Sequence, residues 1–340
     1  MLTACGGGGG GTEPPPPPPP AGATEISADN MNAVAAASIA SANTADFSTG
    51  LESIGQFGSP TASGAIAGAL QHITAALAPA SAGPLPAARI APPPELAMSP
   101  VPSPPEVLLP ISSTNCPGGG SVAISIWDKN LNNQADTLEP FRLRANNCKD
   151  GNDTINGGFD LYVLSLTQAN GVATSADLRA EFSLSTATAG GRSNYLFGTL
   201  RITMTSNAGR ATTIVQGTPG WMQSEGDRFV SVVHDSYQAS VSEQASGGSI
   251  VDFSSAARLS SVGVTRPIEG TLLTRTTTPI ALAADGSIVS GSMRISAQGK
   301  PAVLDVIIAN DVATLALDAD GNGSIDTTRN LTMQELAKLF

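Results

Sequence analysis

The sequence has 340 residues, a net charge of −11 at neutral pH and a charged fraction of only 13%. An isoelectric point of about 4.5 disfavours binding to a polyanion such as nucleic acid, and no run of apolar residues is long enough to cross a bilayer as a helix. Glycine and proline are concentrated before residue 121, so we expect the C-terminal two thirds to hold the folded core.

The first 26 residues combine a cysteine with tracts of glycine and proline. Cys5 is followed directly by six glycines, and residues 14–20 are all proline. Neither tract can build a hydrophobic core, and seven prolines in the polyproline II conformation extend by about 20 Å. This low-complexity segment is predicted to be a tether.

The four residues Leu2-Thr3-Ala4-Cys5 resemble the lipobox of bacterial lipoproteins. The resemblance implies cleavage before Cys5, a thioether-linked lipid on its sulfur and attachment to a membrane of the cell envelope. Gly6 resembles the following residue of lipoproteins sorted to the outer membrane. A complete signal peptide also needs a basic and an apolar region, so we expect the reading frame to begin about fifteen to twenty residues before Met1. The alternative is a cytosolic protein with a chance cysteine.

Residues 27–78 are rich in alanine and predict two helices. The first is indicated by helical spacing of Met31, Val34, Ala35, Ile39 and Ala42, with Ser27 or Asp29 as the cap. The second lies at 65–78 and carries Ile66, Leu70, Ile73 and Leu77 on one face. His72 falls off that stripe and is expected to face solvent. The helices could pack on the later domain, form a partner surface or stay loosely ordered.

Residues 79–115 are proline-rich and have no sustained period, which predicts a second linker. The two remaining cysteines, Cys116 and Cys148, follow it and could form a disulfide. Closing a loop of that length would add about 3–4 kcal/mol of stability. Free buried thiols are the alternative. A metal site on these cysteines is disfavoured, because the chain has no CxxC and its two histidines, His72 and His234, are isolated.

Residues 116–340 are predicted to be mainly β. Short runs of strand character recur, namely SVAISIW, FDLYVLSL, AEFSLSTA, TLRITMTS, RFVSVVH, VLDVIIA and VATLALD. The Asn, Asp and Gly clusters between them suit hairpins better than helical crossovers. We therefore expect an antiparallel meander sheet or a partial barrel or sandwich. The last ten residues have helical spacing, and Thr332 with Glu335 forms a possible capping box.

The segment DADGNGSIDTTR, residues 318–329, resembles the calcium loop of the EF-hand family. The resemblance implies these ligand positions: Asp318, Asp320, Asn322, Ser324 through its carbonyl, and Asp326. Gly323 matches the sharp turn and Ile325 the apolar plug. The family's bidentate Glu is replaced by Arg329, and the preceding segment is typical of a strand instead of a helix. We expect weak calcium binding, with a Kd of about 10⁻⁴ to 10⁻³ M, unless Glu335 or a neighbouring loop supplies an oxygen.

A less complete version of the loop lies at 128–139. Its candidate ligands are Asp128, Asn130, Asn132, Asp136 and Glu139. The terminal Glu is present here, but Asn133 replaces the loop glycine and Ala135 replaces the plug. For both loops the alternative is a hairpin turn rich in Asp and Asn that needs no metal.

Catalytic motifs are missing from the sequence. It contains no Walker A loop, no GxSxG and no HExxH. His234 and Asp235 are adjacent on a predicted strand, which directs them to opposite faces. We therefore expect a noncatalytic lipoprotein of the bacterial envelope with a structural, adhesive or scaffolding role. The alternatives are a module that binds a lipid, a glycan or a protein, and, less favoured, a hydrolase with a serine triad through His234.

Overall fold

The computed structural model describes residues 25–46, 107–128, 139–169, 172–207, 210–244, 248–262, 269–283 and 287–337. Cys5 with the rest of the lipobox, the second predicted helix and most of the predicted second linker lie outside these residues. No helix within the described ranges is long and apolar enough to span a membrane.

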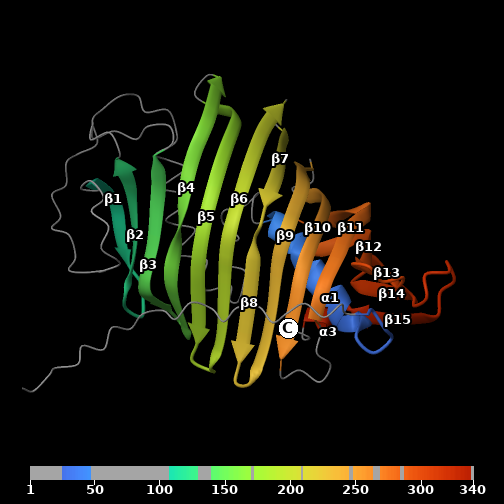
Figure 1. Ribbon diagram of the computed structural model, residues 1–340. Helices are drawn as coiled ribbons and strands as arrows, with labels where there is room; N and C mark the ends of the chain where they lie inside the picture. Colours follow the sequence, from blue (N-terminus) through green and yellow to red (C-terminus); the bar gives the residue numbers. More distant parts are fainter. Residues whose placement is uncertain are drawn as a thin grey trace, which may run out of the picture.

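The described chain forms one helix, fifteen strands and a short final helix (Figure 1). Helix α1 is Met31–Asp46 and helix α3 is Met333–Ala337. The strands of the first half are β1 Val107–Asn115, β2 Ser121–Asp128, β3 Pro140–Asp150, β4 Asp153–Ala169, β5 Val172–Thr188, β6 Arg192–Asn207, β7 Arg210–Gly217 and β8 Gly220–Glu225. The strands of the second half are β9 Arg228–Glu243, β10 Ser249–Val262, β11 Glu269–Leu282, β12 Ile288–Ala297, β13 Val303–Ala309, β14 Val312–Asp318 and β15 Thr327–Thr332.

All fifteen strands belong to one antiparallel sheet, which confirms the predicted meander. Strands pair in sequence order from β1 to β15, with one branch: β7 and β8 both lie between β6 and β9. Thr218 and Pro219 lie between the two strands and belong to neither, so β7 and β8 together take the place of one long strand between β6 and β9. The sheet begins at Val107, inside the segment 79–115 that was expected to be a linker.

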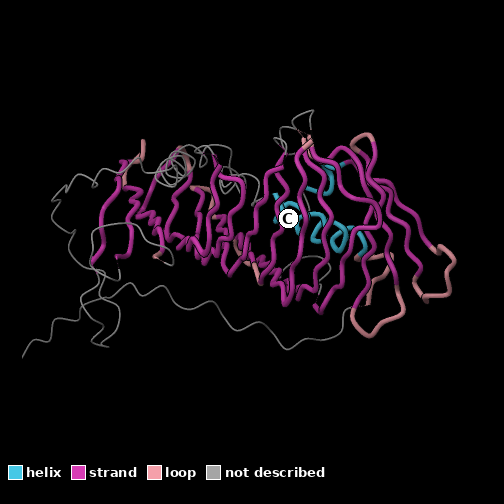
Figure 2. The backbone as a smooth tube through the Cα atoms, turned by 90° about the horizontal axis from the view of Figure 1, so that it is seen from above, coloured by secondary structure: helices cyan, strands magenta, loops and turns pink. Residues whose placement is uncertain are grey.

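One face of the sheet is apolar because small and branched side chains alternate with polar ones along each strand. The buried positions of β12, for example, are Gly291, Met293, Ile295 and Ala297, while Arg294 between them is exposed. We call the apolar side the inner face and the opposite side the outer face. Helix α1 packs on the inner face, against β9, β10, β13 and β14. Figure 2 shows the C-terminal strands curving around it.

Helix α1 follows a turn in which the Ser27 carbonyl accepts hydrogen bonds from the backbone N–H groups of Asn30 and Met31. Its residues 34–39 are all buried, on every side of the helix. Four of those six side chains are Ala or Ser, and such short side chains let the helix backbone approach the sheet closely. Of the possibilities left open for the first predicted helix, the structure shows packing on the β body.

The outer face carries ion pairs between neighbouring strands. The pairs include Arg201–Asp177 at 2.7 Å, Arg294–Asp305 at 2.7 Å, Arg258–Asp235 at 3.0 Å and Arg142–Asp160 at 3.3 Å. Side-chain hydrogen bonds from Arg201 lower the pKa of Asp177. Exposed pairs of this kind each contribute little stability. Their charged side chains make the outer face polar along the sheet.

Candidate functional site

The loop between β14 and β15 brings three of the predicted metal ligands together. One carboxylate oxygen from each of Asp318, Asp320 and Asp326 lies within 4.8 Å of the others. Asp318 is buried at the end of β14, whereas Asp320 and Asp326 are exposed. The strand before the loop is β14, as its alternating pattern predicted.

Asp318 organises the loop through backbone hydrogen bonds. Its Oδ1 accepts from the N–H groups of Gly321 at 2.8 Å and Asn322 at 3.2 Å, and its Oδ2 accepts from Gly323 at 2.8 Å. A carboxylate has about four acceptor positions, so one remains for a cation. Gly323 has a φ of +90°, which a residue with a side chain rarely adopts. It forms a turn, as its match to the EF-hand glycine predicted.

The other polar residues of the loop bind one another and the backbone. Asp320 accepts from the N–H and the side-chain amide of Asn322, and Asn322 Oδ1 accepts from the N–H of Ser324 at 2.7 Å. Asp326 closes the loop: its N–H donates to the Leu317 carbonyl at 2.8 Å, and its Oδ2 accepts from Ala319 N–H at 2.8 Å. The loop is therefore held in shape by its own hydrogen bonds. Three carboxylates this close repel one another, and a hard dication among them would offset the repulsion.

Arg329 and Glu335, which were expected to influence the loop, form hydrogen bonds with residues outside it. Arg329 lies on β15, and its Nη1 donates to Asn32 Oδ1 of α1 at 3.5 Å. Glu335 Oε2 accepts from the N–H and the hydroxyl of Thr332 at 2.8 and 2.9 Å, and Glu335 N–H donates to the Thr332 hydroxyl. These bonds are the predicted capping box, at the start of α3, and Glu335 is not one of the three clustered carboxylates. Ile325 is 50% exposed, so its predicted role as an apolar plug is wrong.

The second predicted loop is described only at its two ends. Asp128 ends β2 and Glu139 precedes β3, and both are buried, at 1% and 4% exposure. Asn130, Asn132 and Asp136 lie outside the described residues. The structure therefore places two of the five candidate ligands at neighbouring strand ends and leaves the loop between them as a prediction.

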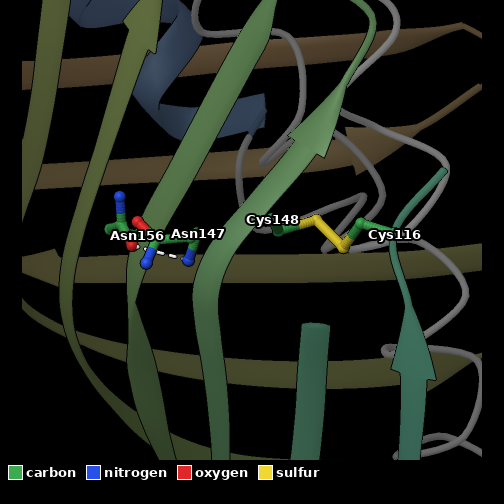
Figure 3. Close-up of a disulfide and its surroundings, with 4 residues drawn as sticks. All are labelled: Cys116, Asn147, Cys148 and Asn156. Atoms are coloured by element: carbon green, nitrogen blue, oxygen red, sulfur yellow. Dashed lines mark hydrogen bonds between the residues drawn. A yellow bond between two sulfur atoms is a disulfide. The ribbon is translucent and has the colours of Figure 1, made fainter. Parts of the chain in front are cut away.

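The predicted disulfide between Cys116 and Cys148 is present, with the two Cα atoms 5.4 Å apart (Figure 3). It joins the β1–β2 turn to the end of β3, so it holds the first hairpin of the sheet to its neighbour. Asn147, next to Cys148, has a φ of +46°, and its N–H donates to Asn156 Oδ1 at 2.7 Å. This bond stabilises the irregular backbone between Ala145 and Cys148.

His234 is buried between β9 and α1. Its Nε2 lies 3.5 Å from the Ser41 hydroxyl of α1, and its ring packs edge-on against Tyr237, whose hydroxyl donates to the Ser41 carbonyl. Burial lowers the pKa of His234 to about 4 and raises that of Tyr237. Within the described residues the Nδ1 of His234 has no hydrogen-bond partner. A serine hydroxyl is therefore near this histidine, but no described carboxylate orients the ring as a triad requires.

Asp235 points to the outer face and pairs with Arg258, so the predicted divergence of His234 and Asp235 is confirmed. Tyr237 was not identified from the sequence, because three residues along a regular strand would place it on the face opposite His234. A shift of register beside β10, between the partners Ala256 and Ala257, puts both rings on the inner face. The serines of α1 were missed because serine is too common in the chain to single out.

Comparisons with known proteins found no match to a family model, a curated protein or a solved structure.

Proposed function

We propose that this protein is a noncatalytic lipoprotein of the bacterial envelope, attached through Cys5, that displays a long β scaffold stabilised by calcium. The observation that supports a scaffold best is the sheet itself. Its fifteen strands follow one antiparallel path, so every interior strand is hydrogen-bonded on both sides. The disulfide between Cys116 and Cys148 joins the turn of the first hairpin to β3.

Calcium is proposed at the loop Asp318–Asp326. The three carboxylates lie close enough for one ion to contact all of them, and oxygen ligands suit this hard cation. The loop also joins β14 to β15, the last strand, so binding there would stabilise the C-terminal edge of the scaffold. The absence of a carboxylate at residue 329 is consistent with the weak affinity expected from the sequence.

The calcium proposal is tested by thermal unfolding of the full chain with and without 10 mM calcium. For a Kd near 10⁻³ M, binding to the folded state alone adds about 1.4 kcal/mol, which raises the Tm by roughly 3–6 °C. The variant Asp320→Asn/Asp326→Asn should lose the shift, because Asn keeps the hydrogen-bonding shape but not the charge. The control Asp311→Asn removes an exposed carboxylate from the nearby β13–β14 turn, and this variant should keep the calcium-dependent rise in Tm. An equal shift in both variants contradicts the site.

The lipid anchor is tested on the protein made from its own gene with the upstream region included. Mass spectrometry should find an N-terminal peptide that begins at Cys5 and carries diacylglycerol. Cys5→Ser should release the protein from the membrane fraction. An unmodified Cys5 in a protein that retains Met1 would refute lipidation and with it the proposed location.

A second candidate function is glycan binding on the outer face of β2–β6. Trp127 lies 4.2 Å beneath the guanidinium of Arg142, Tyr162 lies 4.4 Å beneath that of Arg179, and Tyr195 stacks on Phe197 at 5.2 Å. In an aromatic-poor chain, these four rings lie on the outer face of the alternate strands β2, β4 and β6. Flat rings beside charged side chains are suited to stacking on sugars and bonding their hydroxyls.

A glycan array probed with the purified chain tests this alternative. Specific binding that Trp127→Ala and Tyr162→Ala each weaken at least tenfold, while Phe253→Leu on the inner face leaves it unchanged, would favour the binding module. Absence of binding to any glycan would favour the scaffold.

A further inference from the structure

The contact between α1 and the sheet is polar as well as apolar. Ser38 Oγ of α1 lies 3.2 Å from Thr274 Oγ1 of β11, and Ser41 Oγ of α1 lies 3.5 Å from His234 Nε2 of β9. The Tyr237 hydroxyl donates to the Ser41 carbonyl at 3.1 Å. None of these five residues is more than 5% exposed. The polar contacts therefore lie inside the interface, shielded from water, and fix the position of α1 on the sheet.

The sheet contributes a row of polar side chains to this interface. Tyr237 of β9, Ser255 of β10 and Thr274 of β11 are direct cross-strand partners, so they lie side by side on the inner face. His234 joins them because of the register shift beside Ala257. In the described part of the chain, Ser255 Oγ and His234 Nδ1 lack a hydrogen-bond partner. Buried polar atoms without a partner lower the stability of an interface. We call this set of residues the polar seam: Ser38, Ser41, His234, Tyr237, Ser255 and Thr274.

No negative charge faces the His234 ring among the residues that the structure describes. Residues 31–41 of α1 contain no titratable side chain. Across the strands, the neighbours of His234 are Ala257 of β10 and Pro219, whose carbonyl accepts the His234 N–H. Tyr237 packs against the ring, and its raised pKa keeps it neutral. A proton added to the docked ring would therefore create a buried cation without a counter-ion.

We propose that α1 is an acid-releasable cover of the inner face, which leaves the sheet when His234 becomes protonated. Undocking brings the imidazolium into water, whereas the docked ring would hold its charge in an apolar interior. The strands stay paired, because their hydrogen bonds run between neighbouring strands and do not involve α1. Release uncovers the inner face of β9, β10, β13 and β14, against which α1 packs. This inference requires neither the lipid anchor nor calcium.

The protonation equilibrium of His234 gives the size and the direction of the effect. The pKa of the ring is about 4 in the docked state, and its ordinary value in water is 6.5. Acid favours the state with the higher pKa, so low pH shifts the equilibrium toward the undocked form by up to about 300-fold. The stability of the docked helix is fully present above pH 6.5 and is lost as the pH falls from about 6.5 to 4.

Hydrogen exchange of the full chain, measured by mass spectrometry at pH 7 and pH 3.5 and corrected for intrinsic rates, tests the release. In the wild type, protection of the backbone N–H groups of α1 should fall by at least about tenfold at pH 3.5. Peptides of β4–β6 should keep their protection, and that of α1 should return at pH 7. Equal loss in α1 and β4–β6 would mean that the whole molecule unfolds and would overturn the proposal. A helix that stays protected at pH 3.5 would overturn it too.

Two variants separate His234 from the other groups that titrate in acid. His234→Asn cannot take up a proton, so the protection of its α1 should change by about threefold or less between the two pH values. Asp235→Asn removes the adjacent carboxylate, which lies on the outer face and pairs with Arg258. This variant should release α1 as the wild type does. Equal loss of protection in His234→Asn and in the wild type would contradict the role of the ring.

NMR of the wild type keeps the test decisive if His234→Asn fails to fold. The chain has one other histidine, His72, so a spectrum of His72→Gln assigns the ring signals of His234. Protonation of this ring and loss of protection in α1 should have the same midpoint pH. A His234 ring that takes up a proton while α1 stays protected would overturn the proposal.

Discussion

At the scale of single residues, His234 is a buried group with a clear consequence for the pH dependence of stability. Its pKa of about 4 lies below the ordinary value of 6.5 because the ring is removed from water. The unfolded chain therefore takes up a proton at a higher pH than the folded chain. The associated stability is fully present above pH 6.5, declines as the pH falls from about 6.5 to 4, and changes no further below that range.

We predict that the wild type loses roughly 2–3 kcal/mol more stability between pH 7 and pH 4.5 than His234→Asn, which cannot titrate. Urea unfolding of both proteins at the two pH values measures the difference. Carboxylates that titrate in this range affect both proteins equally and cancel. Parallel pH profiles for the two proteins would mean that His234 is accessible to protons in the folded state.

At the same scale, the acidic loop between β14 and β15 shows how far residue identity alone could lead. The residues Asp318, Asp320 and Asp326 were identified from spacing, since an Asp- and Gly-rich turn of this kind draws alternate side chains inward. The capping box of Thr332 and Glu335 was predicted, because its hydrogen bonds join residues three apart. The direction of Arg329 could not be predicted, because its partner Asn32 is distant in sequence. A hydrogen bond between residues close in sequence can be predicted from a short segment, whereas one between distant segments cannot.

At the scale of elements, the structure makes α1 part of the sheet's core and not a separate module. Ile39 of α1 is 6% exposed, whereas Ile307 of β13 is 52% exposed on the outer face. Ile39→Ala should lower the free energy of unfolding by about 2–5 kcal/mol. The same change at Ile307 should cost about 1 kcal/mol or less. Chemical denaturation measures both, and similar losses would mean that α1 does not share the core.

The disulfide stabilises the hairpin of β1 and β2. Its loop has a sequence separation of 32 residues, so Cys116→Ala/Cys148→Ala should destabilise the protein by about 3–4 kcal/mol. A reductant should lower the Tm of the wild type to about the Tm of the variant, and it should leave the Tm of the variant unchanged. A wild type insensitive to reductant under unfolding conditions would contradict a structural role for this bridge.

Strand prediction succeeded where the apolar alternation was strong and failed where it was weak. The runs that became β2, β4, β5, β6, β9, β13 and β14 are rich in Val, Ile, Leu and Phe. By contrast, β10 is rich in Ser and Ala, and β11 contains a run of polar threonines followed by Pro279, so the apolar alternation is weak in both. They are strands because neighbours on both sides satisfy their backbone groups and α1 lies on their inner face.

At the scale of the whole molecule, the sheet has two edges that are poorly suited to further pairing. Edge strand β1 contains Pro110, which has no N–H to donate, followed by a register shift before Ser112. Edge strand β15 has six residues, and none of them is buried. Both features oppose edge-to-edge association.

We therefore predict that Pro110→Thr, which restores a donor on the β1 edge, increases self-association at high concentration. Static light scattering over a concentration series should report a larger mean mass for Pro110→Thr than for the wild type. The control Pro301→Thr lies in a turn away from β1 and should behave as the wild type does. A wild type that associates as strongly as Pro110→Thr would refute protection by the proline.

The sequence by itself determined the β class, the antiparallel connection of the strands, which two cysteines could pair and the position of the acidic loop. Each of these depends on alternation, turn residues or spacing, which act over a few residues. Only the tertiary structure decided that α1 lies on the inner face, that His234 and Tyr237 share that face, and that Val107 already begins the sheet. These depend on which surfaces exclude water together and on a single register shift, and neither is written in any short stretch of the chain.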